Sequence, residues 1–124
     1  MLELMALMLM AHQPLQPVVS GEASYYTIAS SSHMTASGEM MDDADLTCAM
    51  RDGEFGTYYL VVAENGKSVV CRLNDRGPYA RGRVIDLSRA AMRKLNPQLG
   101  TLRVDVYKVG ASLPWKDNLL LPAK

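Results

Sequence analysis

The sequence lacks the features that mark several common classes of protein. Only two of its 124 residues are cysteine, Cys48 and Cys71, too few for a four-ligand zinc site or a disulfide framework. Its 13 basic and 13 acidic residues balance, so no overall field attracts nucleic acid or an anionic membrane. The apolar stretch at residues 1–11 is shorter than the roughly 20 residues that span a bilayer. A length of 124 residues supports one small domain with a modest hydrophobic core. The short apolar stretch favours no stable membrane span.

Both ends of the chain are predicted to lie outside this domain. Residues 1–20 combine an apolar leader with a linker that holds two prolines, which disfavour helix and central strand. The leader has the length of the apolar region of a secretory signal but no basic residues before it. The alternative is a segment that packs against the domain or a partner. We assign the domain to residues 21–110 and a C-terminal tail to residues 111–124.

Short β-branched and aromatic runs between turn residues predict a mainly β domain. The predicted strands cover residues 23–28, 46–50, 57–63, 68–73, 84–87 and 102–109. Asn65-Gly66 separates two of these runs, which is a strong signal for a β-hairpin. Many short strands with glycine-rich turns favour a small closed barrel, because closure removes exposed sheet edges.

One short helix is predicted near the end of the domain. Ser88 is a typical N-cap for a helix over residues 89–95, and Asn96-Pro97 ends it. Leu87, Ala91 and Leu95 share one face, which is expected to pack on the barrel.

Two aspartates stand at predicted strand ends. Asp75 follows an apolar strand and precedes the Gly77-Pro78 turn, where a rigid scaffold can place a proton-transfer group. The alternative for Asp75 is an acid that pairs with Arg76 or caps the turn. Asp86 lies just before the helix at Ser88, so we expect it to accept backbone N–H bonds and brace the loop.

A series of short motifs occurs in the order found in a known family. They are Gly21-Glu22-Ala23-Ser24-Tyr25-Tyr26, Thr35-Ala36-Ser37-Gly38-Glu39, Leu46-Thr47, Phe55-Gly56-Thr57, Asn65-Gly66-Lys67-Ser68-Val69, Asn74-Asp75-Arg76-Gly77-Pro78-Tyr79 and Arg83-Val84-Ile85-Asp86-Leu87-Ser88. Together they resemble the double-psi β-barrel domain of the rare lipoprotein A family, which are septal lytic transglycosylases of bacteria. The resemblance covers Gly21 to Gly110.

The resemblance implies a fold and an activity. The fold is a six-stranded double-psi β-barrel with one or two short helices. The activity is cleavage of peptidoglycan glycan strands without water, which leaves a 1,6-anhydro sugar end, and Asp75 matches the family's catalytic aspartate. The reaction implies no metal and no cofactor. It also implies a monomer acting outside the cytoplasm, in the periplasm or as a secreted protein.

Other matched residues are expected at the substrate groove. Tyr25, Thr35, Ser37 and Glu39 match its lining segments, and Asn74, Arg76 and Asp86 are further candidates. A tyrosine can stack on a sugar ring, although alternation along the strand lets only one of Tyr25 and Tyr26 face the groove. Glu39 is expected to be a structural acceptor rather than a second catalyst.

The main departure from the family is at Met50. The family segment reads Thr-Ala-Ala-His-Arg there, whereas this chain has Thr47-Cys48-Ala49-Met50-Arg51. A thioether neither carries charge nor donates a strong hydrogen bond, so loss of the family's catalytic histidine would lower or abolish activity. His33 is a minor candidate to compensate.

The replacement at Met50 keeps other functions open. One alternative is a non-catalytic glycan-binding or wall-loosening module, as in the expansin relatives of this barrel. Another is a structural barrel whose groove serves a protein partner. Cys48 and Cys71 each share a strand face with a site position, so they are expected to form either a disulfide under the groove or a reduced buried pair.

Overall fold

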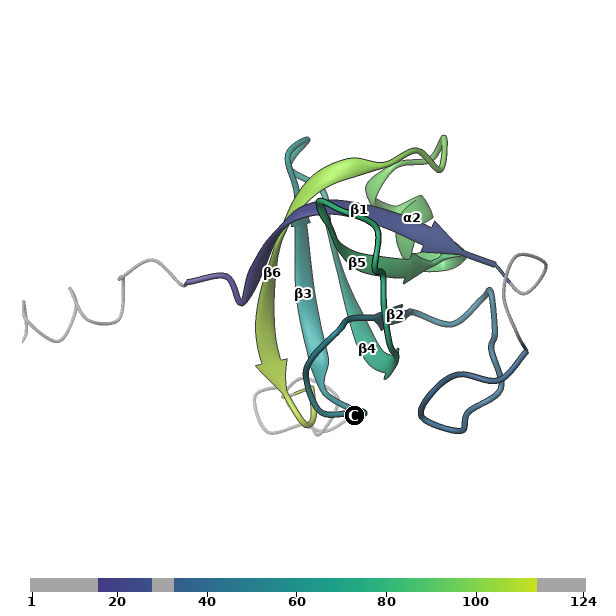
Figure 1. The fold of residues 1–124 in the computed structure, drawn as a ribbon. Coiled ribbons are helices and arrows are strands. Elements are labelled where there is room, and N and C mark those ends of the chain that lie inside the picture. Colours follow the sequence, from purple (N-terminus) through teal and green to yellow (C-terminus); the bar gives the residue numbers. More distant parts are fainter. Residues whose placement is uncertain (1–15, 28–32, 114–124) are drawn as a thin grey trace, which may run out of the picture.

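The structure, a computed structural model, describes residues 16–27 and 33–113 as six strands and a helix (Figure 1). The elements are β1 (Val19–Tyr26), β2 (Thr47–Ala49), β3 (Tyr58–Ala63), β4 (Ser68–Asp75), β5 (Arg83–Ser88), α2 (Arg89–Leu95) and β6 (Leu102–Gly110). The predicted leader and most of the predicted tail lie outside the described residues. No helix among the described residues is long and apolar enough to cross a membrane.

The six strands close into a barrel in the order β1-β5-β2-β4-β3-β6. The β1–β5 and β2–β4 pairs are parallel, and the other four pairs are antiparallel. Alternate residues of the strands fill the interior, and Val61, Ile85, Leu87 and Val106 are fully buried there. The prediction of a closed six-stranded barrel is confirmed.

Local sequence signals account for two of the connections. Asn65 and Gly66 turn β3 into β4, where Gly66 has a φ of 87° and Ala63 N–H donates to Lys67 O at 2.8 Å. Ser88 caps α2, because its Oγ accepts the Ala91 N–H at 3.2 Å. The predicted hairpin and helix are both confirmed.

Several strand ends differ from the predicted ones, and two of the differences matter for the site. β1 begins at Val19, because Val19 and Ser20 pair with Val106 and Asp105 of β6. β4 runs on to Asp75, so the acid is the last residue of the strand itself. Asp75 is therefore positioned by sheet hydrogen bonding as well as by the turn that follows.

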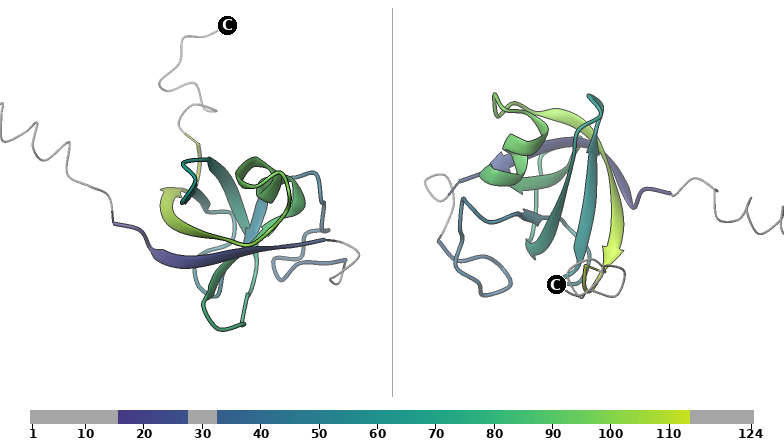
Figure 2. Two further views of the ribbon diagram at one scale, coloured as in Figure 1. Left: turned by 90° about the horizontal axis from the view of Figure 1, so that it is seen from above. Right: turned by 180° about the vertical axis from the view of Figure 1, so that it is seen from behind.

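The residues around Asp75 gather at one end of the barrel. Residues 33–41 form a loop that extends from the barrel near the end of β4, away from α2 (Figures 1 and 2). The short strand β2 lies between β4 and β5 and brings their ends together. The barrel thus places Asp75 of β4 and Asp86 of β5 on either side of β2.

Candidate active site

Asp75 stands at an irregularity in the sheet. In the β2–β4 pair Cys48 is opposite Leu73, but the next residue, Ala49, is opposite Asp75, so Asn74 is left over. A bulge of this kind bends the strand and re-aims the side chains beside it, and bulges are common next to active sites. The bulge therefore sets the direction of the Asp75 side chain.

The Asp75 carboxylate is held by one of its two oxygens. Oδ1 accepts backbone N–H groups from Ala36 and Arg76, both at 2.9 Å. Oδ2 receives no hydrogen bond from the described part of the chain, and the side chain is half-buried. The two N–H groups therefore fix the orientation of the carboxylate at the end of β4.

The Arg76 side chain turns away from Asp75. Its guanidinium donates to Gly53 O at 2.7 Å and to Met50 O at 3.4 Å, and it lies 4.1 Å from the centre of the Phe55 ring. The two salt bridges between described residues both belong to Arg72. Arg76 thus braces the loop that follows β2, and only its backbone N–H serves Asp75.

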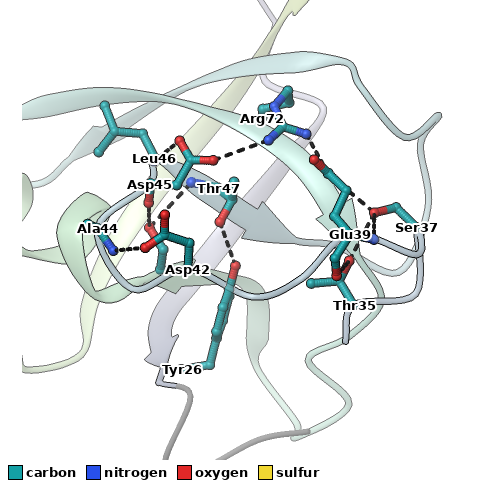
Figure 3. Close-up of polar contacts among 11 residues, drawn as sticks. Tyr26, Thr35, Ser37, Glu39, Asp42, Ala44, Asp45, Leu46, Thr47 and Arg72 are labelled. Carbon is teal, nitrogen blue, oxygen red and sulfur yellow. Dashed lines mark hydrogen bonds and ion pairs between the residues drawn. The ribbon is translucent and has the colours of Figure 1, made fainter. Parts of the chain in front are cut away.

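Three predicted groove residues form a network within the 33–41 loop (Figure 3). Thr35 Oγ1 lies 2.9 Å from Ser37 Oγ and donates to Glu39 O at 3.1 Å, and Ser37 Oγ donates to Glu39 Oε1 at 3.3 Å. Thr35 is only 5% exposed. These hydroxyls shape the loop that presents the Ala36 N–H to Asp75.

An arginine ties this loop to the barrel. Arg72 of β4 bonds Glu39 Oε1 at 2.5 Å and Asp45 Oδ2 at 3.3 Å. The hydrogen bond from Arg72 is the largest cause that holds the pKa of Glu39 below its usual value, with smaller contributions from Ser37 and Asn74. Glu39 is therefore a charged anchor and is poorly suited to donate a proton near neutral pH.

Asp86 has a different environment from Asp75. Its Oδ1 accepts the Ser24 hydroxyl at 2.9 Å across the β1–β5 pair, and it lies opposite Ala49 of β2. Burial is the main cause that raises its pKa, and the charge of Asp75 raises it further. The expected bracing of the helix start is not found among the described residues, because Ser88 itself caps the helix.

The raised pKa of Asp86 predicts a pH-dependent effect of Asp86→Asn. A folded-state pKa above the unfolded one gives stability that is present at low pH and is lost as pH rises through the folded pKa. An asparagine Oδ1 still accepts the Ser24 hydroxyl but does not titrate. We expect the melting temperature of the variant to rise relative to that of the parent as pH increases from about 3 to about 7. Thermal unfolding across this range measures the gap, and a gap that does not change with pH would contradict the assignment.

Of the two tyrosines at the end of β1, Tyr26 is the one on which the charges of both aspartates act. Tyr26 is 5% exposed, and its hydroxyl lies 2.8 Å from Thr47 Oγ1. Burial raises its pKa, and the charges of Asp75 and Asp86 act in the same direction. Tyr25, which the motif match favoured, is 36% exposed and lies on the other face of β1. Tyr26 and Thr47 are thus neighbours of the site that sequence reasoning missed.

Met50 stands where the motif resemblance predicts a histidine. Its side chain is 5% exposed and belongs to the hydrophobic core. Its N–H donates to Asp75 O at 3.2 Å, so positions 50 and 75 are direct neighbours. His33 is exposed, and its carbonyl accepts the Met41 N–H at 2.7 Å.

The remaining predicted residues lie beneath the site. Asn74 is 3% exposed, and its Oδ1 has no hydrogen-bond partner in the described part of the chain. Cys48 and Cys71 are buried as free thiols. No three His, Cys, Asp or Glu side chains gather as a metal site within residues 16–27 and 33–113.

Exposed apolar side chains stand on the loops beside Asp75. Two hollows, of about 910 and 550 Å³, are lined by residues of α2 and of β3 and β4, and Asp75 lines neither. Tyr79, in the loop after Asp75, is 75% exposed. Met34 and Met40, which flank the loop that binds Asp75, are 56% and 65% exposed. Such a surface suits an extended ligand better than a small molecule enclosed in a pocket.

The barrel and the aspartate at the end of β4 define a class of protein, the double-psi β-barrels. The model of the lytic transglycolase family matches residues 18–106. This match covers more than half of the chain, so the chain belongs to that family. The resemblance predicted from the motifs is confirmed.

Two curated relatives carry related names. The chain is 45% identical over 93 residues to the probable endolytic peptidoglycan transglycosylase RlpA of Treponema pallidum, which covers 73% of this chain and 29% of that protein. It is 40% identical over 99 residues to the endolytic peptidoglycan transglycosylase RlpA of Vibrio cholerae. That match covers 78% of this chain and 38% of the other protein. The chain therefore spans about a third of the length of these relatives.

Solved structures share the fold at low sequence identity. The Streptomyces papain inhibitor matches with a TM-score of 0.59 and 23% identity, covering 77% of this chain and 99% of that one. An expansin from Clavibacter michiganensis matches with a TM-score of 0.58 and 20% identity, covering 76% and 51%. At these identities the likeness concerns the fold alone.

Proposed function

We propose that this domain cleaves peptidoglycan glycan strands as an endolytic lytic transglycosylase, with Asp75 as the general acid and then the general base. The observation that carries the proposal is the half-buried Asp75 carboxylate at the end of β4, whose orientation is fixed by two backbone N–H groups at Oδ1. The relatives, which are named as endolytic peptidoglycan transglycosylases, support the substrate class. On this proposal the protein acts outside the cytoplasm, where peptidoglycan lies.

The proposed reaction needs only one carboxyl group that changes role. Protonated Asp75 donates its proton to the glycosidic oxygen, and the bond to the sugar C1 breaks with oxocarbenium character. Asp75, now a carboxylate, takes the proton of the same sugar's 6-hydroxyl as that oxygen bonds to C1. The products are one chain with a new hydroxyl end and one with a 1,6-anhydro end, and no water is consumed.

The surface around Asp75 supports a polymeric substrate. A glycan strand that is cut internally must enter and leave at both sides of the acid, so the protein must contact it on both sides of Asp75. Tyr79, Met34 and Met40 are exposed on the two loops beside Asp75. Aromatic and thioether side chains of this kind can pack on the apolar faces of sugar rings.

A second candidate is a non-catalytic module that binds wall glycan. The observation that favours it is Met50, whose backbone bonds that of Asp75 and whose thioether side chain cannot transfer a proton. The likeness to an expansin is consistent with this alternative at the level of fold.

Product analysis distinguishes the two candidates. Purified glycan strands without stem peptides are incubated with the protein, and the fragments are analysed by mass spectrometry. We expect internal cuts with anhydro ends, which are lighter by one water than reducing ends. Reducing ends would make the protein a hydrolase instead. Binding to insoluble wall without any fragments would favour the binding module.

A further inference from the structure

Cys48 and Cys71 form a pair of thiols inside the barrel, below the strand ends that carry the site. Both are 0% exposed, and the Cys71 thiol donates to Cys48 Sγ at 2.8 Å. Cys48 lies on β2 and Cys71 on β4, the parallel pair whose register ends at Ala49 and Asp75. The two sulfurs therefore connect the strands that position Asp75.

The pairing of β2 with β4 is short and becomes irregular next to Asp75. β2 has three residues, and its register with β4 shifts between Cys48 and Ala49. The extra residue on β4, Asn74, keeps a buried Oδ1 without a partner in the described part of the chain. A covalent link between β2 and β4 just before the shift would restrain the bulge that directs Asp75.

We propose that Cys48 and Cys71 are joined by a disulfide in the mature protein, and that the bond forms before the barrel closes around them. The two thiols lose two protons, and their two electrons reduce the disulfide of a small or protein thiol oxidant, which leaves as two thiols. An oxidised glutathione molecule is sufficient as the oxidant. The proposal stands apart from the proposed catalytic activity, because mass, thiol content and melting temperature test it.

The order of events follows from burial. Thiol–disulfide exchange needs a thiolate that an oxidant can reach. Burial is the largest cause that raises the pKa of the Cys48 thiol, and the hydrogen bond with Cys71 raises it further. The folded, reduced barrel therefore reacts slowly, whereas the open chain exposes both thiols. After closure the bond is shielded from reductants in the same way.

The test compares two ways of oxidising the full chain. One sample is unfolded and reduced, then refolded with oxidised and reduced glutathione. The other is refolded in reductant and then exposed, while folded, to the same glutathione mixture. We expect the first sample to be a monomer that is lighter than the reduced protein by two hydrogen atoms and has no free thiol after denaturation. Its melting temperature should be roughly 10–20 °C higher than that of the reduced protein. The second should keep its thiols for at least about 10-fold longer than the open chain.

A matched variant separates the bond from the conditions. The C48A/C71V double variant fills the same positions with apolar side chains, and its melting temperature should be the same with and without reductant. Free thiols, glutathione adducts or linked dimers in the first sample would overturn the disulfide. Equally fast oxidation of the folded sample would overturn the proposed order. Export of the chain into an oxidising compartment gives the same comparison without refolding, so a poor refolding yield does not leave the question open.

Discussion

The Asp75→Asn variant is expected to lose glycan cleavage by a factor of about 10²–10⁴ while its melting temperature stays unchanged. The change removes the group that gives and takes the proton, so both proposed steps fail. The amide keeps an oxygen at the Oδ1 position, where the Ala36 and Arg76 N–H groups donate at 2.9 Å. Fragment release from stripped glycan strands and thermal unfolding measure the two parts of this result.

Two further variants test whether the loss of cleavage comes from the Asp75 carboxyl group itself. Asp75→Ala also removes the acceptor of both N–H groups, so it should lose activity and about 1–3 kcal/mol of unfolding free energy. Asp52→Asn makes the same chemical change on the exposed loop after β2 and should cleave like the parent. Cleavage by Asp75→Asn at the parent's rate would exclude Asp75 as the proton donor.

The parts of the fold that sequence alone predicts are those with local causes. Asn65-Gly66 specifies the β3–β4 hairpin, and the Ser88 hydroxyl specifies the start of α2. The pairing of β1 with β5 has no such local cause, because Ser24 and Asp86 are 62 residues apart. Periodicity predicts strands but not their partners, so the barrel topology came from the motif resemblance.

The sequence marks a candidate site at Asp75, but it does not give the geometry of that site. The turn after Asp75 marks the acid, yet the Ala36 N–H reaches it only through the folding of a loop 39 residues away. Strict alternation fails in β1, where Ala23 and Ser24 are both buried, and Ser24 bonds Asp86. This break, beside a register shift between Glu22 and Ala23, is invisible in the sequence pattern. The expectation for Tyr25 came from the motif resemblance, because alternation alone left open which of Tyr25 and Tyr26 faces inward.

The Met50→His variant is expected to raise glycan cleavage by about 10²-fold or more, or to create it where the parent has none. The N–H of residue 50 donates to the Asp75 carbonyl, so the backbone that would carry the imidazole lies beside that of Asp75. Imidazole transfers protons near neutral pH, whereas a thioether does not. Initial rates on stripped glycan strands, measured beside the parent at equal concentration, give the factor.

The same variant should be less stable, which provides its control. Met50 is 5% exposed in the core, so histidine loses apolar burial there and costs about 1–3 kcal/mol. The loss should grow as pH falls, because burial disfavours the imidazolium form. Met50→Leu keeps the volume, should cost less than about 1.5 kcal/mol, and should not gain activity.

Comparison of the two variants at position 50 decides between the enzyme and the binding module. A rise in anhydro-ended products with Met50→His that Asp75→Asn abolishes in the double variant would mean that the surface around Asp75 still binds and orients glycan. If the Met50→His variant cleaves glycan and the parent does not, the parent is a glycan-binding protein. It would then lack only one proton-transfer group that catalysis needs. Equal rates for Met50→His and Met50→Leu would contradict the expected gain. The geometry around Asp75, rather than the identity of residue 50 alone, would then limit the reaction.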